Sequence, residues 1–368
     1  MMTNDISLYI HIPFCVKKCN YCAFYSLPDQ DDDIKQRYFE ALCRQISFFN
    51  TDKRVSTIYF GGGTPPMLGV DRLCKLIELI RSRFNLKDDC EITIEINPET
   101  VDYNSLSLLK GAGVNRLSIG VQSSDDTILK RLARIHSFET AKRCILDARA
   151  IGFDNVSVDV IFGLPNASEE SFERTLLDIM STEPNHISAY SLQVEEGTPI
   201  YKSRDSLTFP DEDGEERQYE LLCKTLADNG YTHYEISSFA RDGYRSRHNS
   251  NYWNLTEYFG FGAAAHSFYN KKRFSAVCDV NEFIERSKIS LFAPTDYESQ
   301  CVLTDDELEE ERIMLGLRTI DGVVVPEKAF KTAERIANLG FGSFENGVLR
   351  LNSKGFRVSN EIISEIII

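Results

Sequence analysis

The chain has 368 residues, of which 42% are hydrophobic, and this suits a large α/β domain with a sizeable core and one smaller unit. Its 41 Lys and Arg residues against 56 Asp and Glu residues give a net charge of −15, which argues against a nucleic-acid partner or an anionic-membrane surface. No apolar run approaches the roughly 18 residues that a membrane-spanning helix needs, so we expect no membrane-spanning helix.

Strand-like and helix-like segments alternate from the N-terminus. Strands are expected at residues 8–12, 57–60, 92–96, 116–121, 155–162 and 187–193, and amphipathic helices at 36–49, 71–84, 138–150 and 169–180. This order predicts an α/β fold of parallel strands with crossover helices, as an open sheet or a (β/α) barrel. Ile92, Ile94 and Ile96 face away from Thr93 and Glu95, so one strand face is polar. A filled barrel would have apolar residues on both faces, so we expect an incomplete barrel around a wet cavity.

Each of the six predicted strands is followed by a loop of unusual composition. These loops are the three-cysteine segment 15–22, Gly61-Gly62-Gly63-Thr64-Pro65, Asn97-Pro98-Glu99, Gln122-Ser123-Ser124, Gly163-Leu164-Pro165 and Glu195-Glu196-Gly197-Thr198-Pro199. In a parallel α/β arrangement all of them emerge at the C-terminal ends of the strands, where active sites are built. The sequence therefore predicts one site at this rim.

The C-terminal part should form a separate unit, because periodicity is lost between residues 287 and 300. We expect a barrel over residues 1–285 and a small α+β module over 286–368. The module should contain helices over 305–317 and 326–339, a hairpin over 347–355 and a final helix ending at 368. Helices followed by a β wing resemble a winged helix, and in so acidic a chain a lid or docking role fits better than DNA binding.

Three cysteines, Cys15, Cys19 and Cys22, have the spacing C-x3-C-x2-C. They are compatible with a redox dithiol at Cys19 and Cys22, with zinc completed by His11, or with an iron–sulfur cluster that leaves one iron open. A redox dithiol should open a helix in a thioredoxin-like fold, and His11 lies on a strand before Pro13, so the cluster is favoured.

The other seven cysteines are scattered without regular spacing. They are Cys43, Cys74, Cys90, Cys144, Cys223, Cys278 and Cys301, which are expected to be reduced, buried fillers. No signal peptide opens the chain, and a cytoplasmic location is expected.

The cysteine motif, preceded by Tyr9-Ile-His-Ile-Pro13, resembles the radical S-adenosylmethionine (SAM) superfamily and its oxygen-independent coproporphyrinogen oxidase group, over nearly the whole chain. The resemblance implies an incomplete, TIM-like (β/α)6 barrel. It also implies a [4Fe–4S] cluster on the three cysteines, with SAM on the open iron. By the same resemblance, SAM contacts are expected from Tyr9, Gly62, Gly63, Thr64, Glu95, Gln122, Arg134, Asp159 and Ser191.

Two subtypes of this group differ close to the cluster. Members that oxidise coproporphyrinogen carry a further cysteine two places after the third and a long N-terminal extension. Here Phe24 occupies that place and fourteen residues precede Cys15. Both departures speak against the decarboxylase activity of porphyrin biosynthesis.

The chain is more similar to the HemW-type heme chaperones, which share the Cys-x-Phe ending and an H-N-x-x-Y-W motif, here at residues 248–253. The resemblance implies heme as cargo and a heme-acceptor protein, with the heme site at His248, Asn249, Tyr252 and Trp253 and with Arg245 and Arg247 pairing the propionates. Three alternatives stay open: a coproporphyrinogen III dehydrogenase, a radical SAM enzyme for another tetrapyrrole, and, for the motif alone, a loop that packs Trp253 under the barrel with His248 hydrogen-bonded.

Overall fold

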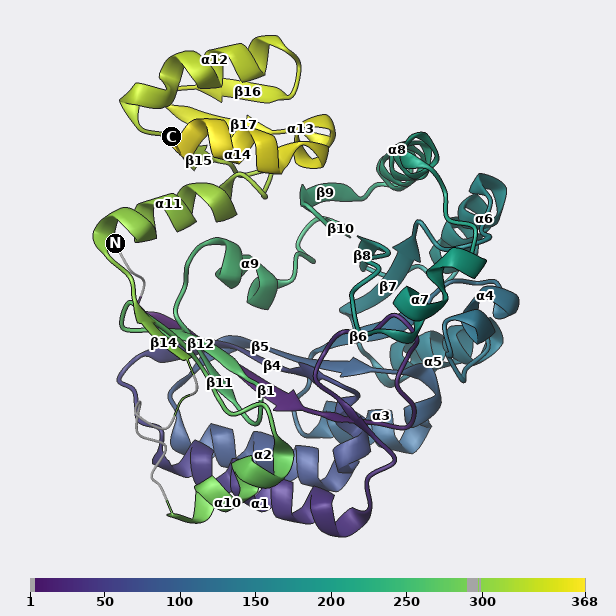
Figure 1. The fold of residues 1–368 in the computed structure, drawn as a ribbon. Helices are drawn as coiled ribbons and strands as arrows, with labels where there is room; N and C mark the ends of the chain where they lie inside the picture. The colour runs from purple at the N-terminus through teal and green to yellow at the C-terminus, as the bar shows by residue number, and fades with distance from the viewer. Residues whose placement is uncertain (1–3, 290–296, 298, 368) are drawn as a thin grey trace.

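A twelve-stranded sheet dominates the computed structural model, which describes residues 4–289, 297 and 299–367 (Figure 1). Its middle consists of six strands in chain order, each parallel to the next: β1 (Asp5–Ile12), β4 (Arg54–Gly62), β5 (Leu86–Ile96), β6 (Arg116–Gln122), β7 (Val156–Phe162) and β8 (His186–Ser191). All six predicted strands are thus confirmed. The right-handed crossover rule places the connecting helices on one face.

Additional strands extend the sheet at both edges. Beyond β1 come β11 (Tyr258–Phe261), β12 (His266–Tyr269), β13 (Lys272–Ser275) and β14 (Ser299–Val302), and beyond β8 come β10 (Ser238–Ala240) and β9 (Thr232–Glu235). In the part of the chain that the structure describes, β14 and β9 are the two ends of the sheet and do not pair with each other. The barrel is therefore incomplete, as predicted.

Helices cover the outer face of the sheet. They include α1 (Asp32–Phe48), α2 (Val70–Arg83), α3 (Tyr103–Gly111), α5 (Phe138–Ile151), α6 (Glu169–Met180), α8 (Glu212–Asp228) and α10 (Val280–Ile289), and Figure 1 shows α1, α2, α3 and α10 below the sheet. Ile92, Ile94 and Ile96 turn to this layer and are at most 2% exposed. Asp31 and Asp211 cap α1 and α8 by accepting backbone N–H bonds, so the acidic run at 211–216 opens a helix.

The C-terminal module has its own hydrophobic core. It comprises α11 (Asp305–Gly316), β15 (Val323–Val324), α12 (Phe330–Asn338), β16 (Gly342–Glu345), β17 (Val348–Leu351), α13 (Ser353–Arg357) and α14 (Ser359–Ile367), with β17 between β15 and β16. The hairpin begins earlier than predicted, because Asn346 and Gly347 form its turn, both with positive φ. Gly355, expected in the hairpin, lies in α13.

The two cores lie on either side of residue 304. Helix α10 packs against α1, and β14 pairs with β13 in the large sheet, so both belong to the barrel although they extend beyond residue 285. The second core contains residues from Ile313 to Ile366. We propose that the division lies between β14 and α11, later than the 285/286 boundary expected from lost periodicity.

All ten cysteines are free thiols in the structure. Cys90 and Cys144 are buried as predicted, but Cys278 and Cys301 are exposed. The prediction of buried fillers was wrong for these two, and Cys43, Cys74 and Cys223 are only partly buried. Within the described residues, Cys301 lies on the terminal strand of the sheet. None of the described helices combines the length and apolar character needed to cross a membrane.

Candidate cofactor site

A cavity of about 520 Å³ opens at the C-terminal ends of the parallel strands. Its walls include Cys15, Cys19, Cys22, Gly62, Gly63, Thr64, Glu95, Asn97, Ser118, Gly120, Gln122, Arg134, Asp159 and Ser191. The structure thus brings the three cysteines together with eight of the nine residues expected to contact SAM. The volume lies in the range of sites for small ligands and cofactors.

Tyr9, the ninth of these residues, does not line the cavity. It pairs with Tyr59 across β1 and β4, whereas the next layer, His11 and Gly61, lies closer to the rim. Its hydroxyl lies 3.0 Å from His11 Nδ1, and its ring stacks on Tyr59 at 6.2 Å. Tyr9 therefore supports the cavity floor from one layer below.

The cysteine loop is fixed at both ends and in its middle. Its ends are joined by the short parallel pair β2 (Phe14–Cys15) and β3 (Leu27–Pro28). In the middle, the backbone N–H of Asn20 donates to Leu132 O at 3.1 Å, and its side-chain amide donates to Arg131 O at 2.8 Å. The loop is held against α4 (Asp126–Arg131) in a fixed shape.

The surroundings of the cysteines disfavour the zinc and dithiol interpretations. Both ring nitrogens of His11 are engaged, one with Tyr9 Oη and the other with Tyr25 O at 3.2 Å. Among the described residues, no group of three or more His, Cys, Asp or Glu side chains is arranged to hold a single metal ion. Cys19 and Cys22 lie in a turn and not at the start of a helix. Three thiolates spread over several iron atoms of a cluster fit this donor set better.

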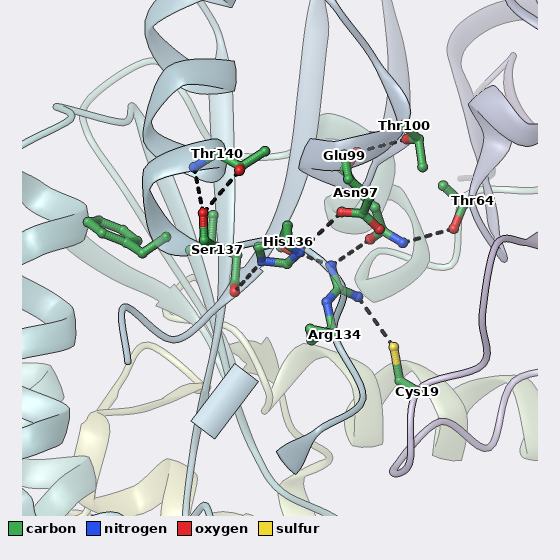
Figure 2. A network of polar contacts seen from close by, with 12 residues as sticks. Cys19, Thr64, Asn97, Glu99, Thr100, Arg134, His136, Ser137 and Thr140 are labelled. Carbon is green, nitrogen blue, oxygen red and sulfur yellow. Dashed lines mark hydrogen bonds and ion pairs between the residues drawn. The ribbon is translucent and has the colours of Figure 1, made fainter. Parts of the chain in front are cut away.

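A polar chain in the cavity wall connects two of the cysteines, and Figure 2 shows its part from Cys19 through Arg134 and Asn97 to Thr64. Thr64 Oγ1 lies 3.7 Å from Cys15 Sγ and accepts a 2.9 Å hydrogen bond from Asn97 Nδ2. Arg134 Nη2 donates to Asn97 Oδ1 at 2.7 Å and to Gly120 O at 2.6 Å, and Arg134 Nη1 lies 3.5 Å from Cys19 Sγ. The chain fixes the guanidinium beside the sulfur atoms and leaves Arg134 Nε without a partner among the described residues.

Positive charge near the thiols matters because the site itself opposes their ionisation. Burial raises the pKa of both Cys15 and Cys22, whereas the hydrogen bond from Thr64 works the other way at Cys15. Thiolates here therefore need a cationic partner, which iron supplies. The three free thiols, the adjacent guanidinium and the open cavity fit a cluster with one open iron.

The glycine loop gives the cavity a wall of bare backbone. Gly62 has a φ of +106°, and a Cβ there would lie 2.4 Å from the His11 ring. A Cβ on Gly63 would lie 2.8 Å from Phe14 O, so neither position accepts a side chain. A ligand can approach the main chain of this loop closely, as expected for the methionine end of SAM.

Two carboxylates face the cavity from the polar side of the strands. Glu95 accepts hydrogen bonds from Tyr59 Oη at 2.7 Å and from Gly62 N at 3.2 Å, and Asp159 accepts one from Ser118 Oγ at 3.2 Å. Burial, reinforced by the nearby Asp159 charge, raises the pKa of Glu95 to about 7. Burial likewise raises the pKa of Asp159 to about 6, against the field of Arg116. Such carboxylates can accept hydrogen bonds from ligand hydroxyls.

The motif at residues 248–253 lies away from this cavity, on α9 (Arg247–Trp253). His248 is 1% exposed, with Nδ1 2.8 Å from Thr57 Oγ1 and Nε2 2.8 Å from Tyr252 Oη. Arg245 pairs with Asp321, and Arg247 pairs with Asp89. In this conformation neither ring nitrogen can bind iron, and the arrangement matches the alternative in which His248 is hydrogen-bonded under the barrel.

The remaining motif residues have different surroundings. Asn249 donates its backbone N–H to Ser246 Oγ in the first turn of α9. Trp253 is partly buried, and its Nε1 has no hydrogen-bond partner among the described residues. The motif thus forms a short helix capped by Ser246 at one end of the barrel.

Sequence reasoning did not single out several cavity residues. Asn97, placed only in a rim loop, connects Arg134 to Thr64, and Ser118 orients Asp159. Both residues fall on the polar face of the alternating pattern of their strands, so that alternation could have identified them from the sequence. Lys17 and Lys18 also line the cavity, and only their position inside the cysteine loop pointed to them.

The fold and the three-cysteine cavity define a protein of the radical SAM class. A family model described as the Radical SAM superfamily matches residues 9–179, which include the cysteines and the glycine loop. The solved structure of coproporphyrinogen III oxidase (HemN) from Escherichia coli superimposes with a TM-score of 0.85, covering 98% of this chain and 89% of that one. At 21% identity this likeness shows the fold alone.

Sequence relatives narrow the class further. The heme chaperone HemW of Bacillus subtilis is 35% identical over 96% of this chain and 93% of its own, and HemW of Lactococcus lactis is 31% identical over 100% and 99%. HemW of Escherichia coli is 39% identical over 71% of this chain and 69% of its own. The chain belongs to the HemW family.

Proposed function

We propose that this protein is a heme chaperone, which binds heme and passes it to an acceptor protein while holding a [4Fe–4S] cluster and SAM. The observation that carries the proposal is full-length similarity to HemW proteins, which extends across both the barrel and the C-terminal module. The ten free cysteines are in keeping with a reducing cytoplasm as the place of action.

In this proposal the residues on one side of the cavity hold the cluster. Cys15, Cys19 and Cys22 hold the cluster, and Arg134 balances thiolate charge while donating to Asn97 and Gly120. The cluster, with SAM on its open iron, supplies one-electron chemistry.

Ligand contacts come from the other walls of the cavity. The bare backbone of Gly62 and Gly63 admits the amino-acid end of SAM, and Glu95, oriented by Tyr59, accepts hydrogen bonds from the ribose hydroxyls. Gln122, Asp159 and Ser191 complete the polar wall. The acceptor protein itself is known only by its role.

A second candidate is a coproporphyrinogen III dehydrogenase, the activity that the resemblance of the cysteine motif to the oxygen-independent coproporphyrinogen oxidase group implies. The side chain two places after Cys22 distinguishes the two candidates. Phe24 occupies this place and is 71% exposed at the cavity, where the oxidising subtype is expected to carry a cysteine. A phenyl ring offers neither a thiol proton nor a metal ligand, so the chaperone is the better-supported function.

The heme site at His248, Asn249, Tyr252 and Trp253 stays a prediction. Iron ligation by His248 would require the ring to leave Thr57 and Tyr252, whose hydrogen bonds occupy both nitrogens. Heme transfer through this motif therefore implies a conformational change.

The two functions are separated by two assays on one anaerobic preparation with reconstituted cluster. We expect an absorbance titration to show stoichiometric heme binding, and incubation with coproporphyrinogen, SAM and a reductant to give no vinyl product. A preparation lacking the cluster, with Cys15, Cys19 and Cys22 replaced by Ala, controls for cluster-dependent effects. Formation of protoporphyrinogen without heme binding would establish the dehydrogenase instead.

A further inference from the structure

An exposed aromatic and basic patch borders the mouth of the cofactor cavity. We call it the mouth patch and define it as Lys17, Lys18 and Phe24, all of which line the cavity. Phe24 is 71% exposed. Exposed aromatic surface beside a cavity is typical of a binding site, because burying such rings on a ligand is favourable.

Hydrogen bonds within the cysteine loop fix the backbone that carries Phe24. Lys18 Nζ donates a 3.0 Å hydrogen bond to Phe24 O, and Cys22 N donates to Cys19 O at 3.2 Å. On the other side of the loop, Tyr21 packs against the small apolar cluster around Leu132 and Leu164. One aromatic residue of the loop is thus packed inward while Phe24 stays outside. Because the loop backbone is already ordered, it loses little entropy when a ligand stacks on Phe24.

The charge of the mouth patch is opposite to that of the whole chain. Lys17 is exposed and has no ion-pair or hydrogen-bond partner among the described residues. The ammonium group of Lys18 donates a hydrogen bond to the carbonyl oxygen of Phe24. Glu195 also lines the cavity. Against a net charge of −15, this pair of lysines forms a local attraction for an anionic group.

The size of the cavity decides where a large planar ligand can lie. Its volume of about 520 Å³ suits one small cofactor, and its inner walls are the polar groups Glu95, Asn97 and Asp159. A porphyrin is apolar over both faces, so it is poorly matched to these carboxylates. The exposed apolar surface that it needs lies at the mouth, on Phe24.

We propose that heme binds across the mouth of the cofactor cavity, with Phe24 stacked on the porphyrin face and the propionates directed to Lys17 and Lys18. The proposal rests on the heme-chaperone function and names the place of the cargo. The alternative place, α9, has both nitrogens of His248 occupied.

Heme in this position would cover the route by which SAM enters. Heme bound first is therefore expected to slow SAM association, and SAM bound first to leave heme affinity nearly unchanged, since the two ligands occupy successive layers. This order effect distinguishes the mouth from a site on α9, which does not line the cavity.

The test is an equilibrium heme titration of the full-length protein with reconstituted cluster. We expect Phe24→Ala to weaken heme binding about tenfold and Phe24→Tyr to keep it within about twofold, as loss and retention of one stacked ring predict. Lys17→Glu should weaken binding about fivefold at low salt, and high salt should reduce the difference. Leu177→Ala and Lys75→Glu, exposed positions on α6 and α2, make matched changes outside the cavity and should bind heme like the wild type.

Retained cluster absorbance and an unchanged unfolding midpoint establish that each variant is folded. If Phe24→Ala and Lys17→Glu bind heme like the wild type while His248→Ala loses it, the cargo lies on α9; the mouth proposal is then wrong and the chaperone function stands. If the wild type binds no heme, the chaperone function itself fails. Equal losses in the Leu177 and Lys75 variants would also overturn the mouth proposal.

Discussion

Glu95 shows how a single side chain can respond to the state of the cofactor cavity. Its carboxylate is surrounded by the strands and held by Tyr59 Oη and Gly62 N, with Asp159 as a neighbouring charge. Because burial outweighs these two hydrogen bonds, its pKa rises from 4.5 to about 7. Without a ligand, an ionised Glu95 therefore costs the fold free energy.

Replacing Glu95 by Gln should stabilise the ligand-free protein at alkaline pH. The folded state retains the Glu95 proton up to about pH 7, whereas the unfolded chain releases it near 4.5, so wild-type stability falls as pH rises between these values. The Gln variant lacks this loss, and its free energy of unfolding should exceed that of the wild type by on the order of 2 kcal/mol at about pH 8.

Denaturant unfolding across this pH range measures the effect, with Glu78→Gln on the exposed face of α2 as a control. The same Glu95 variant should bind SAM more weakly, since an amide donates as well as accepts hydrogen bonds. A wild-type minus variant difference that does not change with pH would contradict the raised pKa.

At the scale of elements, periodicity and spacing in the sequence predicted the strands, their polar face and the loops at the rim. The alternation in β5 and β7 located both strands and their polar face, because parallel strands beside a cavity must place opposite chemistry on opposite sides. The rim loops followed from the direction of the strands, and the resemblance then assigned Glu95 and Arg134 to the same cavity. In the structure both residues line one cavity, while their contacts with SAM stay a prediction.

The rest depended on tertiary contacts between distant segments. Short strands such as β9 and β10 carry too few residues for a period to show. The burial of His248 arises from Thr57 and Tyr252, and the first of these lies 191 residues away. Tyr9 differed from expectation by one layer of the strand, a distinction that residue type does not make.

Helix α9 packs against β4 and is hydrogen-bonded to β5. Glu91 on β5 accepts hydrogen bonds from the first two backbone N–H groups of the helix, at 3.1 and 2.9 Å. The ring of His248 stacks on Tyr59 at 4.9 Å, one residue layer from the cavity wall. Burial lowers the pKa of His248 to about 3, assisted by the Arg116 charge, so the ring is neutral at physiological pH.

His248→Ala should therefore destabilise the protein by about 2–4 kcal/mol near neutral pH, because Thr57 and Tyr252 lose a buried partner and the ring leaves a cavity. As pH falls from 6.5 towards 3, the unfolded chain takes up a proton on His248 and the folded protein does not, so the free energy of unfolding of the wild type decreases. The advantage of the wild type over the variant should shrink over this range.

Unfolding of His248→Ala is compared with that of His266→Ala, whose side chain is exposed. Near-equal stability of the two variants at neutral pH would show that α9 does not depend on the His248 contacts. In that case a conformation in which the ring is free to bind iron would become accessible at little cost.

At the scale of the whole molecule, the C-terminal module joins the barrel beside β9 and α9 (Figure 1). Backbone hydrogen bonds run from Ile236 N to Arg318 O and from Ile320 N to Tyr234 O, both at 2.9 Å. Within the described part of the chain, the residues that line the cavity all belong to the barrel. A docking role for the module therefore agrees with its position better than a lid over the cofactor cavity.

Apolar packing should hold the module in place more strongly than its ion pairs do. Ile236 packs against the module core from the barrel side, whereas Arg245 and Asp321 are 41% and 68% exposed in their side chains. An exposed ion pair contributes about 0–1 kcal/mol, so Asp321→Ala should leave unfolding almost unchanged. Ile236→Asp places a charge against apolar surface and should weaken docking by about 3 kcal/mol.

Limited proteolysis followed by mass spectrometry checks this order. In Ile236→Asp, cleavage in the segment between β14 and α11 should release the module rapidly, while Asp321→Ala should be cleaved at the wild-type rate. The reverse order of sensitivity would mean that the ion pair carries the docking. Heme titration of the Ile236 variant then distinguishes the two candidate heme sites. A site at the cavity mouth should keep its heme affinity when the module is loosened. A site on α9, which α11 of the module contacts, should lose affinity.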